Sequence, residues 1–220
     1  MMADPINDYS NGVFVSYRRD NGNGFEKWVR ELFVAELQKI LKQHLPRDTP
    51  ESKVWMDEQL VRLRPEYLDD LKRELYSSRV LVPILSVDYF TSEYCRWELA
   101  HMIARQQKTQ RSLICPVVLF DGINFPERVK SLFPLTDDPS CHHNFRRFAT
   151  NVFDLDRPTI TIADCAVKIR EFAEQALLPR IQESPQFESD WNSLDATAQT
   201  IAEELVISSS TRTPPPRLIA

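Results

Sequence analysis

The chain has 220 residues, which is enough for one domain with a complete hydrophobic core and a short tail. Hydrophobic residues make up 42% and charged residues 27%, as in ordinary globular proteins, and the formal charge of −5 argues against a nucleic-acid-binding protein. No apolar run approaches the roughly 20 residues of a membrane helix, and the N-terminus lacks the basic start and apolar core of a signal peptide.

Apolar strand patterns alternate with amphipathic helix patterns through the first half of the chain. In order, we predict a strand at 12–17, a helix at about 25–44, a strand at 53–56, a polar loop at 57–65 and a helix at 66–76. The long helix is predicted because its apolar residues recur at three- and four-residue steps. Leu68, Leu71 and Leu75 should face inward from the helix that follows the polar loop.

The second half continues this alternation with one long interruption. We predict a strand at 80–85, a helix from the cap residues Thr91 and Ser92 to about 107, a strand at 112–120, an edge strand at 152–155 and a helix at 161–178. Pro83 and Pro116 should stand at strand ends or bulges, because a proline removes a donor from the ladder. The stretch 121–151 has no clear pattern of its own.

Strands that alternate with helices predict a parallel sheet covered by helices on both faces. Residues 1–11 form an N-terminal extension, residues 12–180 the domain, and residues 181–220 a C-terminal tail. Within the tail we expect an isolated amphipathic helix at 194–207, followed by a disordered end. We also expect the domain to fold without this tail.

One unit of the predicted sheet delivers an acidic side chain to a place where ligands bind. In open α/β sheets, ligands bind outside the carboxyl ends of the strands. The strand at 80–85 ends there, and the helix that follows it carries Glu98 in its first turns, beside Cys95 and Trp97. Taken alone, such a glutamate is most often a solvated residue that interacts with the helix dipole. The residues around it decide between a catalytic and a surface role.

Three segments carry the most specific patterns in the chain. They are VFVSYRRD from Val13, KVWMDEQL from Lys53 and SRVLVPILSVDYFTSEYCRWEL from Ser78. The third joins an apolar strand to the pattern S-x-x-C-x-x-E, which ends at Glu98. Together these segments resemble TIR (Toll/interleukin-1 receptor) domains, in particular those of bacteria. The resemblance covers about 12–178 and implies an α/β, flavodoxin-like sheet of five parallel strands in the order 2-1-3-4-5.

The resemblance also implies an activity. Many TIR domains cleave NAD at the bond between nicotinamide and ribose, some cyclise the product, and the glutamate of the pattern, here Glu98, is essential to them. Arg18 and Arg19 match the position that contacts the dinucleotide, and the loop at 57–65 matches one that borders the pocket and contacts the next protomer. The residues expected to bind the substrate are Ser16, Tyr17, Arg18, Arg19, Asp57, Leu60, Cys95 and Trp97.

A single carboxylate is enough for this reaction. The nicotinamide of NAD is a cationic pyridinium that departs as a neutral molecule, so the general acid of ordinary glycosidases is not required. Glu98 would stabilise positive charge on the ribose, and Arg18 or Arg19 would hold the diphosphate through charge-assisted hydrogen bonds. An aromatic side chain such as Tyr17 or Trp97 could stack on a base.

Other functions would require different residues at these positions. The main alternative is a non-catalytic adaptor that acts through TIR–TIR contacts, with side chains or a buried arginine filling the space around Glu98. A phosphoacceptor receiver domain shares the sheet but needs acidic residues where Arg18 and Arg19 stand. Gly22-Asn23-Gly24 lacks the third glycine of a dinucleotide-binding loop, and Cys141-His142-His143 lacks further ligands at metal-binding spacing, so we expect no metal.

The expected partners and location follow from these patterns. Four separated cysteines, Cys95, Cys115, Cys141 and Cys165, form no C-x-x-C pair and suit free thiols in the cytoplasm. We expect NAD as the substrate and no other cofactor. We also expect self-association through TIR surfaces or binding of a partner protein, without direct contact to nucleic acid or membrane.

Overall fold

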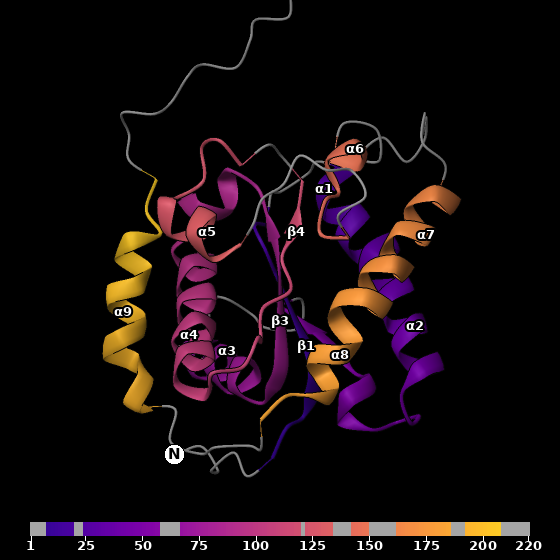
Figure 1. Cartoon of the computed structure of the whole chain (residues 1–220), viewed down its shortest axis with the longest axis horizontal. Coiled ribbons are helices and arrows are strands. Elements are labelled where there is room, and N and C mark those ends of the chain that lie inside the picture. Colours follow the sequence, from indigo (N-terminus) through magenta and orange to yellow (C-terminus); the bar gives the residue numbers. More distant parts are fainter. Residues whose placement is uncertain are drawn as a thin grey trace, which may run out of the picture.

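The computed structural model describes residues 8–19, 24–57, 67–119, 122–133, 142–149, 162–185 and 192–207. At its centre is a parallel sheet with helices on both faces (Figure 1). The strands β1 (Asn11–Tyr17), β2 (Val54–Met56), β3 (Ser78–Leu85) and β4 (Val117–Val118) lie in the order β2-β1-β3-β4. This confirms the predicted flavodoxin-like α/β fold over these four strands. The predicted fifth strand at 152–155 lies outside the described residues.

Two groups of helices cover the sheet (Figure 1). One face carries α1 (Gly24–Lys27), the π-helix Trp28–Val34, α2 (Ala35–His44), α7 (Ile162–Phe172), the π-helix Ala173–Leu177 and α8 (Leu178–Gln182). The other face carries α3 (Tyr67–Tyr76), α4 (Glu93–Thr109) and α5 (Glu127–Leu132), with α9 (Asp195–Glu204) outside α4. The short elements are α6 (Arg146–Ala149) and the 3-10 turns Pro50–Ser52, Asp88–Thr91 and Asn192–Leu194.

The sheet separates two hydrophobic cores, because successive strand residues point to opposite faces. Val13 and Val15 of β1 belong to the core beneath α2 and α7, whereas Phe14 belongs to the core beneath α3 and α4. The same alternation turns Ser16, at the end of β1, toward α4. The position of Ser16 matters because α4 is the helix that carries Glu98.

The predicted helices are present, but the predicted orientation of one side chain is wrong. The helix predicted at 25–44 is continuous, and the last helix runs past Pro179 to 182 through a π-helical stretch that precedes the proline. Leu71 and Leu75 are buried, but Leu68 is 53% exposed, so its predicted inward position is wrong. Tyr67 takes the place one turn before Leu71 in the buried stripe, which turns Leu68 outward.

The two prolines of the sheet interrupt the same ladder. Pro83 lies inside β3, in register with Ser16, so the prediction that it stands at a strand end or bulge is wrong. Leu81 and Leu85, two residues before and after Pro83, form their backbone hydrogen bonds with the segment that contains β4. The N–H that Pro83 lacks would point the same way, so its absence removes a donor to β4. Pro116 directly precedes β4, as predicted. Because Pro83 removes a hydrogen-bond donor between β3 and β4 and Pro116 directly precedes β4, β4 is much shorter than the predicted strand.

The helix that was predicted to be isolated in the tail packs against α4 as α9 (Figure 1). Its apolar residues Leu194, Ala198, Ile201 and Leu205 are buried in the core that α3 and α4 share. The prediction of an isolated helix is therefore wrong, because an amphipathic pattern does not say which surface covers the apolar face. Within the described ranges, no helix has both the length and the apolar character needed to cross a bilayer.

Candidate functional site

A small cavity lies where the carboxyl ends of β1 and β2 meet the first turns of α4. Its volume is about 10 Å³, which is room for about one water molecule. The residues that line it are Val15, Ser16, Tyr17, Arg19, Asp57, Ser92, Tyr94, Cys95 and Glu98. Six of the residues predicted for the site, including Glu98, therefore meet at one place.

Glu98 reaches this cavity because of the way in which α4 begins. Ser92 caps the helix, as predicted, and its hydroxyl accepts a hydrogen bond from the backbone N–H of Cys95 at 3.4 Å. Cys95 and Glu98 are three residues apart and share one face of the helix. Glu98 is only 5% exposed, so it is not the solvated surface glutamate of the alternative interpretation.

Two hydroxyl groups orient the carboxylate of Glu98. The hydroxyl of Ser16 donates to Oε2 of Glu98, and Ser16 Oγ lies 2.8 Å from the hydroxyl of Tyr89. Because Ser16 gives its one proton to Glu98, the one hydroxyl proton of Tyr89 is shared between Ser16 Oγ and the carbonyl oxygen of Cys95, which lies 3.1 Å from the Tyr89 oxygen. Burial, and then interactions with Cys95 and Glu98, raise the pKa of Tyr89 well above its ordinary value, so the phenol keeps that proton.

A second group of polar side chains lines the same cavity. Arg19 Nη2 lies 3.4 Å from Oδ1 of Asp57, and the hydroxyl of Tyr67 donates to Oδ2 of Asp57 at 2.6 Å. The ring of Tyr67 meets the ring of Tyr94 edge-on, with 5.5 Å between the ring centroids. Asp57 therefore lies between the guanidinium of Arg19 and the hydroxyl of Tyr67 at the cavity.

Two predicted residues do not line the cavity. Arg18 is half-buried and is not among its lining residues. Trp97 faces another side of α4, where its ring packs on His101 with 4.0 Å between centroids, because adjacent helix residues point about 100° apart. Leu60, the remaining predicted residue, lies outside the described residues.

Three tyrosines at or behind the cavity escaped the sequence analysis. Tyr67 and Tyr89 contact site residues through their hydroxyls, and neither stands in a position that a strand or helix pattern distinguishes. Tyr94 fits the apolar periodicity of α4, yet it is 38% exposed and lines the cavity. Among the described residues, no three His, Cys, Asp or Glu side chains gather as metal ligands.

Comparison with known proteins identifies one family and shows a likeness to solved structures. A model of the TIR domain matches residues 13–147 of the chain. A search of the curated proteins found no match. Among solved structures, the chain is similar to the TIR domains of the activated Roq1 resistosome directly recognizing the pathogen effector XopQ. That match has 18% sequence identity and a TM-score of 0.35, and it covers 87% of this chain and 97% of the other.

Proposed function

The chain belongs to the TIR domain family, and from this membership we propose that it is an enzyme that cleaves NAD at the bond between nicotinamide and ribose. The observation that supports the proposal most is the buried carboxylate of Glu98, which Ser16 orients in a cavity that Arg19 also lines. Burying a carboxylate is costly, and a buried, oriented one is typical of sites that stabilise charge during a reaction.

Glu98 would supply the one charge that this reaction needs. The nicotinamide takes the electron pair of its bond to the ribose and departs as a neutral molecule, which leaves positive charge on the sugar. A carboxylate fixed beside the sugar stabilises that charge without having to reorient. Water then adds to the sugar carbon in hydrolysis, or a nucleophile of the same molecule adds in cyclisation.

Arg19 and Tyr94 are the best candidates to bind the remainder of the substrate. The guanidinium of Arg19 would exchange Asp57 for the diphosphate of NAD and bind it through charge-assisted hydrogen bonds. The ring of Tyr94, which is exposed at the cavity, can stack on the nicotinamide. Both roles require movement, because a dinucleotide does not fit into about 10 Å³.

The small size of the cavity favours a second candidate function. An adaptor that acts only through TIR–TIR contacts has no need of an open cleft, and here tyrosine side chains leave little space beside Glu98. Under the enzymatic proposal, assembly through TIR surfaces or on a partner protein separates Arg19 from Asp57 and opens the cleft. The outcome would then be defence signalling or depletion of NAD.

The two candidates differ in whether NAD is consumed. Products would be measured by chromatography after incubation of the full chain with NAD, and we expect nicotinamide together with a linear or cyclic ADP-ribose. Glu98→Ala should abolish this turnover. Glu31→Ala is the matched control, because Glu31 is an exposed helical glutamate that does not line the cavity. Turnover that survives Glu98→Ala refutes the role of Glu98, and wild-type protein that associates but consumes no NAD supports the adaptor.

A further inference from the structure

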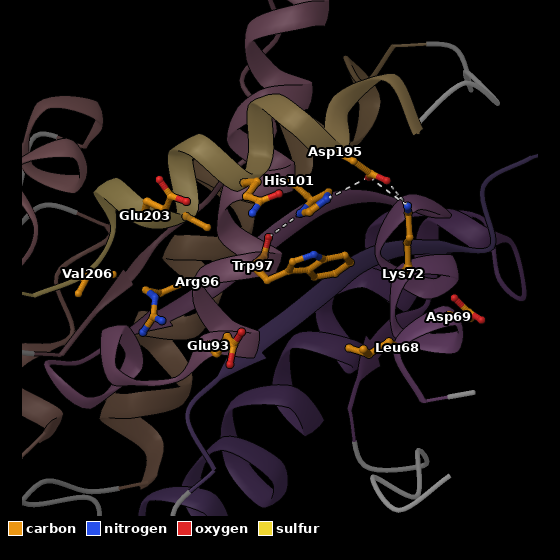
Figure 2. A pocket seen from close by; sticks show the side chains of 12 residues that line it. Leu68, Asp69, Lys72, Glu93, Arg96, Trp97, His101, Asp195, Glu203 and Val206 are labelled. Atoms are coloured by element: carbon orange, nitrogen blue, oxygen red, sulfur yellow. Dashed lines mark hydrogen bonds and ion pairs between the residues drawn. The ribbon is translucent and has the colours of Figure 1, made fainter. Parts of the chain in front are cut away.

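A groove on another face of α4 is much larger than the cavity at Glu98 (Figure 2). Its volume is about 540 Å³, within the roughly 300–1,000 Å³ that is usual for binding clefts. All of its lining residues come from α3, α4, α9 and the turn that follows α9. The groove therefore presents helix side chains and no edge of the sheet.

Hydrogen bonds between α3 and α9 bound one end of the groove. Asp195, the first residue of α9, accepts hydrogen bonds from Lys72 Nζ at 2.7 Å and from the hydroxyl of Tyr76 at 3.1 Å, both on α3. Near its other end, α9 is held by Glu204, which lies 3.5 Å from Arg128. The bonds between α3 and α9 thus lie at the Asp195 end, and Figure 2 shows Val206 at the opposite end of the groove.

The groove combines an aromatic side chain with exposed aliphatic ones. Trp97 lines the groove from α4 and is partly buried against His101. Leu68, on α3, is 53% exposed, and Val206, after α9, is 51% exposed. Single exposed apolar side chains are ordinary, but an apolar group gathered in one hollow is typical of a binding surface.

The rim of the groove is acidic. Asp69, Glu93 and Glu203 come from α3, α4 and α9, and their carboxylates have no hydrogen-bond or ion-pair partner among the described residues. Lys72 pairs with Asp195, whereas Arg96 donates to a backbone carbonyl at 2.7 Å and keeps its positive charge. The groove is still acidic as a whole, because four carboxylates line it against these two cations. A positively charged ligand would therefore meet carboxylates on all three walls.

We propose that this groove binds a basic amphipathic helix of a partner protein. Apolar residues along one face of this helix would pack on Leu68, Trp97 and Val206, which Figure 2 shows spread along the groove, while lysines or arginines would lie near the acidic rim. A helix fits better than an extended peptide, because a groove built only from helices offers no strand edge for backbone pairing. A second copy of this chain, with a formal charge of −5, fits less well because it brings like charge to the rim.

A displayed library of helical peptides, selected against the full chain without NAD, tests this proposal. We expect enriched peptides to carry apolar residues three and four positions apart, with lysine or arginine on the flanks. Binding of the best peptide, measured by fluorescence anisotropy, should weaken about tenfold in Leu68→Ser and at least about tenfold in the double variant Glu93→Lys, Glu203→Lys. Two-dimensional NMR spectra should place the shifted amides on α3, α4 and α9.

Matched controls separate this groove from the rest of the surface. Ile162→Ser changes an apolar side chain that is 52% exposed on α7, and Glu31→Lys reverses an exposed charge on the same face of the sheet as α7. Both controls should keep peptide binding within about twofold of wild type, since neither residue lines the groove.

Several outcomes would overturn the proposal. They are enrichment of no peptides, of acidic peptides or of proline-rich extended peptides, and binding that survives the groove substitutions. A wild-type dimer in sedimentation that Leu68→Ser dissociates would show that a second copy is the occupant. Because binding is measured without NAD, the result does not depend on whether Glu98 is catalytic.

Discussion

Among single residues, Tyr89 and Ser16 have the clearest dependence on each other. Ser16 gives its proton to Glu98, and Tyr89 shares its one hydroxyl proton between Ser16 Oγ at 2.8 Å and the carbonyl oxygen of Cys95 at 3.1 Å. The contact with Cys95 connects the pair to the first turn of α4. The sequence predicts that Ser16 binds the substrate, but its hydroxyl donates to Glu98, so we propose instead that both hydroxyls act through Glu98 as positioning residues.

Removing these hydroxyls should lower kcat and leave KM nearly unchanged. We expect about a tenfold fall in kcat for Tyr89→Phe, which loses the neutral hydrogen bonds to Ser16 and to the Cys95 carbonyl, and a larger fall for Ser16→Ala, which takes a donor from the carboxylate. Tyr76→Phe is the matched control, because the Tyr76 hydroxyl bonds to Asp195 outside the cavity. A rise in KM with unchanged kcat would contradict a positioning role.

His143 predicts a dependence of stability on pH. Burial, and then the neighbouring His142, lower the pKa of His143 from 6.5 to about 4, and the imidazole lies 2.8 Å from the carbonyl oxygen of Pro116. Between these pH values the unfolded chain binds the proton and the folded chain does not, so stability is lost as the pH falls from 6.5 toward 4. The loss from this residue should be about 1–3 kcal/mol.

The variant His143→Gln keeps a donor but cannot titrate. We expect its free energy of unfolding, measured by urea denaturation, to fall less steeply than that of wild type between pH 6.5 and pH 4. Above about pH 7.5 the two curves should run parallel. Equal slopes in the acidic range would show that His143 is protonated in the folded state.

At the scale of secondary-structure elements, the sequence predicts those features that depend only on neighbouring residues, such as helix caps and the face on which a side chain lies. The cap at Ser92 and the spacing of Cys95 and Glu98 put these residues at the start of one helix face, and alternation in β1 puts Ser16 opposite them. Contacts between distant elements are not predictable in this way. Tyr89 meets Ser16 across 73 residues of sequence, so no local pattern indicates that contact.

The same limit explains the errors in the fold. The alternation of strands and helices predicted a parallel sheet, and the family resemblance implied its strand order, which the four described strands confirm. The periodicity of α3 did not show whether Tyr67 or Leu68 leads its buried stripe, and that of α9 did not show that α4 covers its apolar face. Such outcomes depend on the shape and size of the surface that an element meets.

Removing α9 should destabilise the domain, contrary to the expectation from sequence that the tail is dispensable. A chain that ends at Pro185 loses Leu194, Ala198, Ile201 and Leu205 from the core and uncovers α4. We expect a loss of about 3–5 kcal/mol and a melting temperature lower by about 10 °C. A chain that ends at Ile207 keeps α9 and is the control. Equal melting temperatures for both truncated chains would mean that α9 contributes nothing.

For the whole molecule, α4 connects two surfaces. Glu98 lines the closed cavity and Trp97 lines the open groove, and both stand in the first two turns of the same helix. A partner or a second protomer that displaces these turns would act on both surfaces. The closed cavity of the single chain is therefore compatible with an enzyme that is active only in an assembly.

Turnover should accordingly depend on how densely the chains are packed. We expect little NAD consumption per chain in dilute solution and a rise of at least about tenfold when the same amount of protein is tethered on vesicles, since tethering raises the effective concentration. The measurement is the rate of nicotinamide release as a function of surface density. A rate per chain that is independent of density would mean that the cavity opens without assembly.

The catalytic role of Glu98 is tested most directly by kcat and KM for NAD in tethered wild-type protein and in Glu98→Gln, which keeps the shape of the side chain and removes its charge. We expect kcat to fall at least about 100-fold with KM changed little, because the carboxylate acts mainly on charge that develops in the transition state. Activity retained by Glu98→Gln would contradict the account, and so would the absence of NAD cleavage by the wild type at every density.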